Sequence, residues 1–281
     1  MVTVTIHNTN MKTAYLCILL CSNAITYSLC QGTAGKFIER EGDWYISVNA
    51  SASRYCGDLS ERWQFANPQL SWSGAVQIRY RLHERWSLSG EVGAYRLTGD
   101  QQYTRNKDNH LAFETVNPFV NVGVQWDCRS PEKENNVFYL FGVLGGTHLN
   151  PTTMFQGLNY DLPPLHTEGV RYTRLVGQAG YGLGVPFVLS PTVQLRIEGR
   201  YTHVFSDYLD DVSNRYVNKY TATTIERMLA DRRLEYGLLA NPEQARRGNP
   251  DWNDGYFLFT VQLSLKLKTR RSFYGFIHRR H

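Results

Sequence analysis

Acidic side chains crowd one short stretch of the sequence. Asp207, Asp210 and Asp211 fall within five positions of the string Asp207-Tyr208-Leu209-Asp210-Asp211-Val212-Ser213. Carboxylate oxygens are the ligands that calcium prefers, but this spacing does not match an EF-hand loop. Aspartate side chains also accept hydrogen bonds from backbone N–H groups in turns. We therefore expect a structured turn here, with a calcium site or a binding surface as the alternatives.

Nucleophilic catalysis would need a serine or cysteine beside a histidine. His203 and Ser206 are close in sequence, but on a strand their spacing directs them to opposite faces. The chain has no zinc-ligand spacing, no phosphate-binding glycine loop and no Cys–His pair. We therefore expect no enzymatic activity and no cofactor, with an outer-membrane enzyme as the alternative, and we assign no metal ligands.

Long two-faced strands are the elements that would position these residues. Between Leu70 and Leu82 apolar side chains take every second position, and Ser71, Arg79 and Arg81 lie between them. A period of two is that of a β-strand, and the length suits the roughly 9–11 residues that cross a bilayer. Together with this stretch, similar segments make eight: Asp43–Tyr55, Trp86–Thr98, Ala112–Trp126, Val137–Leu149, Tyr172–Val188, Thr192–Ser206 and Gly255–Lys268.

The connections between these segments alternate in length. Residues 83–85, 127–136 and 189–191 are short, and residues 56–69, 99–111, 150–171 and 207–254 are longer. Outer-membrane barrels have short periplasmic turns and long outer loops, and eight is their smallest usual strand number. The sequence therefore predicts an all-β fold: an eight-stranded antiparallel transmembrane outer-membrane β-barrel over residues 43–268, with both termini in the periplasm.

The last and longest loop carries a helix signal. Thr223 and Glu226 have the spacing of a capping box, and Gly237 can end a helix. We expect a short helix over about Thr224–Tyr236, on the outer surface.

Alternation alone does not say which face of the barrel points inward. A soluble lipocalin-type barrel would alternate in the same way, with its apolar face inside. Aromatic residues at strand ends, such as Trp44 and Trp126, instead suit a membrane interface. The polar faces carry both charge signs, and because eight strands leave room only for side chains, we expect these charges to fill the lumen; a narrow channel is the alternative. The charged set is Arg79, Glu91, Arg196, Glu198 and Arg200.

Composition and the N-terminus agree with an exported barrel. The 281 residues are 42% hydrophobic but contain no run of about 18 apolar residues, which argues against a helical membrane protein. Residues 1–30 read as a signal peptide cleaved after Cys30, with lipid attachment at Cys30 as the alternative. Residues 31–42 then form a periplasmic segment and residues 269–281 a basic periplasmic tail. The net charge of +5 comes from dispersed arginines and this tail, so we expect no nucleic-acid partner.

Several motifs resemble those of a family of Bacteroidota outer-membrane barrels. The most specific is the string that contains Asp207, Tyr208, Asp210 and Asp211. The others are Leu162–Gly169 with Thr167, Glu168 and Gly169, Val185–Phe187, Glu198–Arg200 and Arg247–Pro250. This family includes PorG, the small barrel of the type IX secretion system. The resemblance implies a role in assembly, with outer-membrane lipids around the barrel and periplasmic ring proteins of the PorK and PorN type as partners. It equally implies, as the alternative, a family member with a structural or adhesive role.

Two cysteines remain after signal cleavage, Cys56 and Cys128. The strand order places them at opposite ends of the barrel, farther apart than the roughly 7 Å between Cα atoms that a disulfide tolerates. We expect two ordinary thiols; the alternative is that Cys128, on the periplasmic side, bridges to a partner protein. On non-reducing gels of membranes we expect the chain and its Cys128→Ser variant to migrate alike. A shifted band that the variant loses would establish the bridge.

Overall fold

The computed structural model describes residues 37–60, 69–129, 137–217, 220 and 222–267. The predicted signal peptide (1–30) and basic tail (269–281) lie outside the described residues. Eight long strands follow the predicted segments, and every strand end lies within three residues of its predicted position. They are β1 (Trp44–Cys56), β2 (Ser71–His83), β3 (Trp86–Asp100), β4 (Ala112–Asp127), β5 (Tyr139–His148), β8 (Leu175–Val188), β9 (Val193–Val204) and β10 (Gly255–Lys266).

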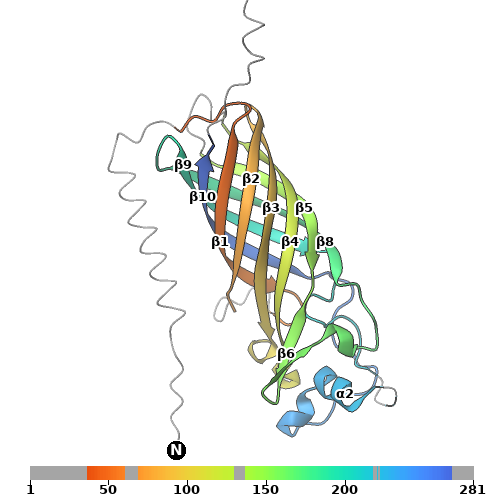
Figure 1. Ribbon diagram of the computed structural model, residues 1–281. Helices are drawn as coiled ribbons and strands as arrows, with labels where there is room; N and C mark the ends of the chain where they lie inside the picture. The colour runs from red at the N-terminus through yellow and green to blue at the C-terminus, as the bar shows by residue number, and fades with distance from the viewer. Residues whose placement is uncertain (1–36, 61–68, 130–136, 218–219, 221, 268–281) are drawn as a thin grey trace, which may run out of the picture.

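These eight strands close into an antiparallel barrel (Figure 1). Each strand pairs with its neighbour along the chain, and β1 pairs with β10 from Tyr45–Lys266 to Cys56–Gly255. Closure leaves no strand edge with unpaired backbone groups inside a bilayer, where no water could satisfy them. The predicted eight-stranded barrel is confirmed.

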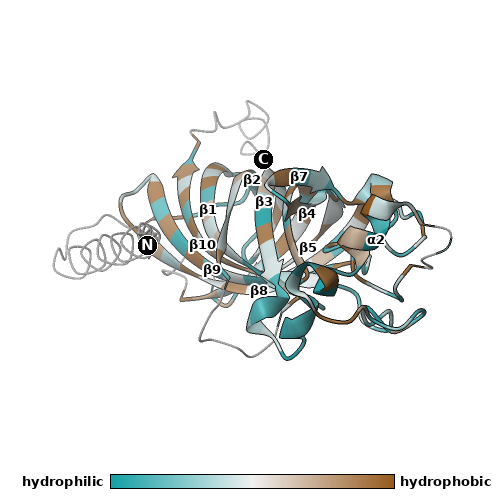
Figure 2. Cartoon of the chain, turned by 90° about the horizontal axis from the view of Figure 1, so that it is seen from below, coloured by the Kyte–Doolittle hydropathy of each residue, from teal (hydrophilic) through white to brown (hydrophobic). Residues whose placement is uncertain are grey.

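The apolar face of each strand points outward. In β1 the exposed positions begin with Trp44, Ile46 and Val48, and the buried positions between them are Tyr45 and Ser47. Figure 2 shows the resulting alternation of hydrophobic and hydrophilic bands along neighbouring strands. An apolar exterior around a polar interior suits lipid and excludes the soluble, lipocalin-type alternative. The barrel is therefore an outer-membrane type barrel with lipid around its belt.

The two ends of the barrel differ. We call the end at His83, Trp86, Asp127 and Val188 the turn end, because short connections join the strands there, and the opposite end the loop end. Beyond the loop end the connections form structure of their own (Figure 1). The shorter pieces are η1 (Gln101–Tyr103), η2 (Lys107–Asn109), β6 (Pro151–Phe155), β7 (Leu158–Asp161), η3 (Pro163–Leu165), α2 (Thr224–Ala230) and η4 (Arg233–Tyr236).

The helix predicted in the last loop is present but shorter than expected. The Thr223–Glu226 capping box forms, and α2 ends at Ala230 because Asp231 adopts an extended conformation. The Asp231 carboxylate accepts the backbone N–H of Arg233, which starts η4, and Gly237 ends η4 in the left-handed region. In the described part of the chain no helix is long and apolar enough to cross a membrane.

The interior changes character along the barrel axis. At membrane depth it is polar, whereas at the loop end a cluster of buried apolar side chains joins the strands to the loops. Its members include Leu97 of β3, Phe113 of β4, Leu209 and Val212 of the last loop, and Leu229 of α2. The loop end therefore has a core like that of a small soluble domain, which holds the long connections against the barrel.

We expect an arginine substitution to have very different effects on stability at two positions that both carry an exposed apolar side chain. Val122 faces lipid from β4, and Leu239 lies in the last loop, outside the belt. An arginine at a lipid-facing position near the bilayer centre costs about 2–4 kcal/mol, and almost nothing in water. Denaturant unfolding in lipid vesicles should therefore show a loss of this size for Val122→Arg and less than about 0.5 kcal/mol for Leu239→Arg. Equal losses for the two variants would contradict the assignment of the belt.

Candidate functional site

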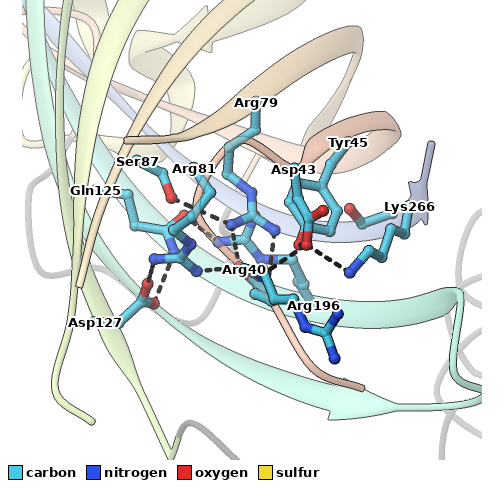
Figure 3. Close-up of polar contacts among 12 residues, drawn as sticks. Arg40, Asp43, Tyr45, Arg79, Arg81, Ser87, Gln125, Asp127, Arg196 and Lys266 are labelled. Carbon is cyan, nitrogen blue, oxygen red and sulfur yellow. Dashed lines mark hydrogen bonds and ion pairs between the residues drawn. The ribbon is translucent and has the colours of Figure 1, made fainter. Parts of the chain in front are cut away.

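The turn end of the lumen is closed by an ionic cluster. The Glu39 carboxylate, supplied by the segment before β1, accepts two hydrogen bonds from the Arg79 guanidinium at 2.7 and 3.1 Å. Arg81 donates to both Glu39 and Asp127. Figure 3 shows Arg79, Arg81 and Asp127 together with Arg196, which comes from β9. All of these guanidinium and carboxylate groups are almost completely buried.

Aromatic rings support this turn-end cluster. The Arg79 guanidinium lies 4.1 Å from the centre of the Tyr45 ring, and that of Arg196 lies 4.0 Å from the centre of the Tyr139 ring. Arg196 also donates to Gln125 at 2.5 Å, and Tyr139 donates to Glu198 at 2.8 Å. Cation–π contacts of this kind gain strength when water is absent. The cluster therefore joins side chains of β1, β2, β4, β5 and β9 across the lumen.

A second ionic cluster lies deeper in the lumen. Arg200 of β9 pairs with Glu91 of β3 at 2.6 Å. Asn49 and Asn121 also donate to the Glu91 carboxylate, at 3.1 and 3.3 Å. Gln178 then donates to Asn121 at 2.8 Å, which links the pair to β8. The five charged residues predicted to fill the lumen are buried: Arg79, Arg196 and Glu198 lie at the turn end, and Glu91 and Arg200 lie deeper in the lumen.

The sequence prediction missed Glu39. Residues 31–42 have no strand pattern, so nothing in the local sequence places a carboxylate inside the barrel. The signal that could have pointed to Glu39 is the total charge of the side chains buried in the lumen. Among the described residues the lumen buries four arginines, Arg79, Arg81, Arg196 and Arg200, whereas the predicted set includes only two carboxylates. Buried charges require partners, so further carboxylates had to be present, and Glu39 and Asp127 supply them.

At the loop end, two of the sequence motifs meet on one arginine. Arg247 donates to Thr167 at 3.2 Å and to Glu168 at 3.1 Å, and it also donates to the backbone carbonyl of Asp211. Glu168 in turn accepts the backbone N–H groups of Ser213 and Asn214 at 2.9 and 2.8 Å. We call Thr167, Glu168, Asp211 and Arg247 the Arg247 cluster.

Other residues of these motifs complete the Arg247 cluster. Asp211 accepts hydrogen bonds from Thr167 and from Tyr172, the latter at 2.7 Å, and has a left-handed backbone with φ of 66°. Tyr208 stacks on Tyr172 with ring centres 4.4 Å apart. Gly169 adopts φ of 72°, a region that favours glycine, and so turns the chain after Glu168. Despite Arg247, burial raises the pKa of Asp211 to about 6.

Asp210, the neighbouring aspartate of the acidic string, lies with Asp254 beside Tyr55. Asp210 and Asp254 both approach the hydroxyl of Tyr55, at 2.6 and 2.9 Å. Asp210 also accepts the backbone N–H of Val212 at 2.9 Å, which is the turn capping that the sequence predicts. Asp254 is a residue that the sequence prediction missed; it directly precedes β10, whose pairing with β1 brings it beside Tyr55.

Gly57 is required beside the Asp210–Asp254 pair. A Cβ atom at this position would lie 1.9 Å from Oδ1 of Asp254 and 2.0 Å from the Tyr55 hydroxyl. These distances are far below van der Waals contact, so any side chain would displace the carboxylate or the ring. The Tyr55-Cys56-Gly57-Asp58 segment is therefore shaped to receive Asp254.

Asp207 lies buried among other carboxylates. Neither of its oxygens has a hydrogen-bond partner among the residues that the structure describes. Burial raises the pKa of Asp207 to about 7, and the nearby carboxylates of Asp58 and Glu168 act in the same direction. Within the described ranges, no group of three or more His, Cys, Asp or Glu residues could hold a metal ion.

Cys56 and Cys128 are each half-buried and lie at opposite ends of the barrel, where no disulfide can join them. The expectation that they do not pair with each other is confirmed. The bridge from Cys128 to a partner protein stays a prediction.

Comparisons with known proteins find likeness only among solved structures. No protein-family model and no curated protein matches the sequence. Neisserial surface protein A is 12% identical, covering 81% of this chain and 100% of its own, with a TM-score of 0.41. Ail, the attachment invasion locus protein of Yersinia pestis, solved with the heparin analogue sucrose octasulfate, is 14% identical with the same coverage and a TM-score of 0.40. OprG, an outer membrane protein from Pseudomonas aeruginosa, is 11% identical over 83% of this chain and 99% of its own, with a TM-score of 0.41. At this identity the similarity concerns the barrel fold alone.

The buried position of Glu39 generates a stability prediction. Glu39→Gln leaves Arg79 without a charged partner and Arg81 with Asp127 alone, and breaking a buried ion pair in this way costs about 3–5 kcal/mol. Glu41→Gln is the matched control, because Glu41 is exposed and, among the described residues, pairs with the exposed His83. Exposed pairs contribute about 0–1 kcal/mol. Denaturant unfolding of both variants in the same vesicles measures the difference. Two variants of equal stability would show that Glu39 does not hold the lumen charges.

Proposed function

We propose that this chain is a non-enzymatic outer-membrane barrel that anchors other envelope proteins and passes no solute. The observation that carries the proposal is the filled lumen. Side chains lining a water-filled channel would be exposed, whereas Arg79, Arg81, Arg196 and Asn121 are each at most 2% exposed. Opening a path would require separating buried ion pairs, at several kcal/mol for each. The function then depends on the protein surfaces at the turn end and the loop end of the barrel.

We assign the turn end to the periplasm and the loop end to the cell exterior. The support is the asymmetry of the connections, since outer-membrane barrels turn tightly in the periplasm and carry long loops outside. Both chain ends then lie in the periplasm. The turn end presents exposed charges of both signs, among them Arg40, Glu41, Arg85 and Arg129. Such a rim suits contact with a periplasmic protein surface.

The partners that we propose are periplasmic ring proteins of the PorK and PorN type, as in the type IX secretion system. The support is the sequence resemblance to the Bacteroidota family, whose most specific strings form connected clusters in this chain. Thr167 and Glu168 contact Arg247 and the segment that contains Asp211, so the motifs act together to shape the loop end. In this proposal Asp207, Tyr208, Asp210 and Asp211 keep the long outer loop folded while the turn end binds the ring.

An adhesive role is the second candidate function. One observation favours it: large apolar side chains are exposed on the last loop, well away from the lipid belt. They are Leu234, Tyr236 and Leu239, which are 63%, 57% and 86% exposed. Exposed apolar groups of this kind are common in surfaces that bind other molecules. This role would use the loop end, so it is separable from ring binding by experiment.

Deletion of the gene tests the secretion role. If the barrel anchors the ring, proteins that normally leave the cell should accumulate in the periplasm, as measured by fractionation and blotting. Full secretion by the deletion strain would overturn the secretion role. Loss of surface attachment with intact secretion would support the adhesive candidate.

Matched charge reversals test which end binds. Arg85→Glu changes an exposed residue at the turn end, and Lys107→Glu changes an exposed residue of η2 at the loop end. We expect in-cell cross-linking to ring proteins to fall several-fold for Arg85→Glu and to stay unchanged for Lys107→Glu. The reverse pattern would move the binding site to the loop end.

A further inference from the structure

At the loop end, one tyrosine hydroxyl lies within hydrogen-bond distance of two buried carboxylates. If both carboxylates are ionised, the hydroxyl has one hydrogen to donate and two acceptors to satisfy. Tyr55 lies 2.6 Å from Oδ2 of Asp210 and 2.9 Å from Oδ1 of Asp254. Its single hydroxyl hydrogen can serve only one of them. The second contact needs another hydrogen, which a protonated carboxyl group supplies. Both contacts are satisfied when Asp210 and Asp254 together hold one proton.

The groups around the pair make this proton hard to lose. The charges that act on Asp210 come from Asp254 and Asp58, and those that act on Asp254 come from Asp207 and Asp58, so all are carboxylates. From β4, the side that packs on Tyr55 is the apolar ring of Phe113, at 4.8 Å between ring centres. Arg247, a guanidinium of the loop end, pairs with Glu168 and lies 3.8 Å from Asp211.

The pair ties both ends of the longest loop to the barrel. Asp210 lies just after β9, at the start of the loop, and Asp254 lies just before β10, at its end. The carboxylate of Asp254 also accepts the backbone N–H of Leu209 at 3.1 Å. Leu209 and Val212 are buried in the loop-end core beside Leu59. A loop held at these points covers the mouth of the barrel.

We propose that Tyr55, Asp210 and Asp254 form an acid-stabilised latch, in which the shared proton keeps residues 207–216 docked on the mouth and its loss releases them. With both carboxylates ionised, two negative charges would share one hydroxyl in a buried site, and their repulsion would favour a conformation in which water solvates them. The latch concerns the loop end only and does not depend on the proposed ring binding.

The direction of the pH effect follows from the raised pKa values. Burial raises the pKa of Asp210 and of Asp254 well above the ordinary value, and raises that of Asp207 to about 7. In the released loop these groups regain ordinary pKa values near 4. Docking is therefore fully stabilised below about pH 4 and weakens as the pH rises through the raised values, by about tenfold per pH unit for each proton released.

Hydrogen exchange of the full-length barrel in phosphatidylcholine vesicles tests the latch. We expect the protection of amides in residues 207–216, corrected for the intrinsic exchange rate, to fall at least tenfold between pH 5 and pH 8. Amides of the lipid-facing part of β4 serve as the internal reference and should not change.

Asparagine variants separate titration from simple destabilisation. Asp254→Asn and Asp210→Asn each keep the size and hydrogen-bonding shape but remove one carboxyl of the pair. Each should therefore reduce the fall in protection of residues 207–216 between pH 5 and pH 8 several-fold, while Asp207 and Asp211 still titrate in both variants. Glu114→Gln is the control, because Glu114 is a half-exposed carboxylate at the loop end that pairs with Arg96; it should keep the wild-type pH dependence. Protection that is independent of pH in the wild type, or a pH dependence as steep in both asparagine variants as in the wild type, would overturn the latch.

Discussion

Charge balance inside a closed barrel is the constraint on which the rest of this structure depends. Eight strands enclose a space that side chains fill, so the guanidinium groups of Arg79, Arg81, Arg196 and Arg200 cannot be solvated by bulk water. Each therefore lies against a carboxylate or an amide oxygen, or over an aromatic ring. The four carboxylates that match them in number among the described residues are Glu39, Glu91, Asp127 and Glu198. The barrel is stable in lipid because its outer surface is apolar. Bulk water stays out of its interior because the buried arginines and carboxylates balance in charge and fill the space.

Buried carboxylates at the loop end are compensated differently from those in the lumen. There the interior is apolar, and the polar groups are gathered into two sets of opposite character. The Arg247 cluster contains its own cation, so its carboxylates are compensated by charge. Among the described residues, the charges that act most strongly on the Asp210–Asp254 pair are carboxylates, and in the proposed latch a proton compensates them. Within one loop, buried carboxylates are therefore stabilised in two chemically distinct ways, by an arginine in the Arg247 cluster and by a proton at the Asp210–Asp254 pair.

The sequence predicts the barrel well because its signal is local. A period of two is visible within each strand, and Leu70–Leu82 shows the inward arginines directly. The capping box of α2 is predictable for the same reason, since Thr223 and Glu226 are only one turn apart. Glu39, Asp254 and the β6–β7 hairpin are not predictable in this way. Their positions depend on pairing between distant segments, and no local pattern distinguishes Glu39 from the exposed Glu41.

The closure of β1 on β10 also has a consequence for the order of folding. Ser47 and Ser264 are hydrogen-bonded across this seam although 217 residues separate them, whereas the other pairings join neighbouring strands of the chain. Contacts between such distant residues carry a large loop-closure entropy and form slowly. Glu39 lies just before β1 and can enter the lumen only when that strand is in place. The step that seals the sheet is therefore also the step that completes the buried ion pairs, so a half-closed barrel would leave charged side chains unpaired and favour completion of the circle.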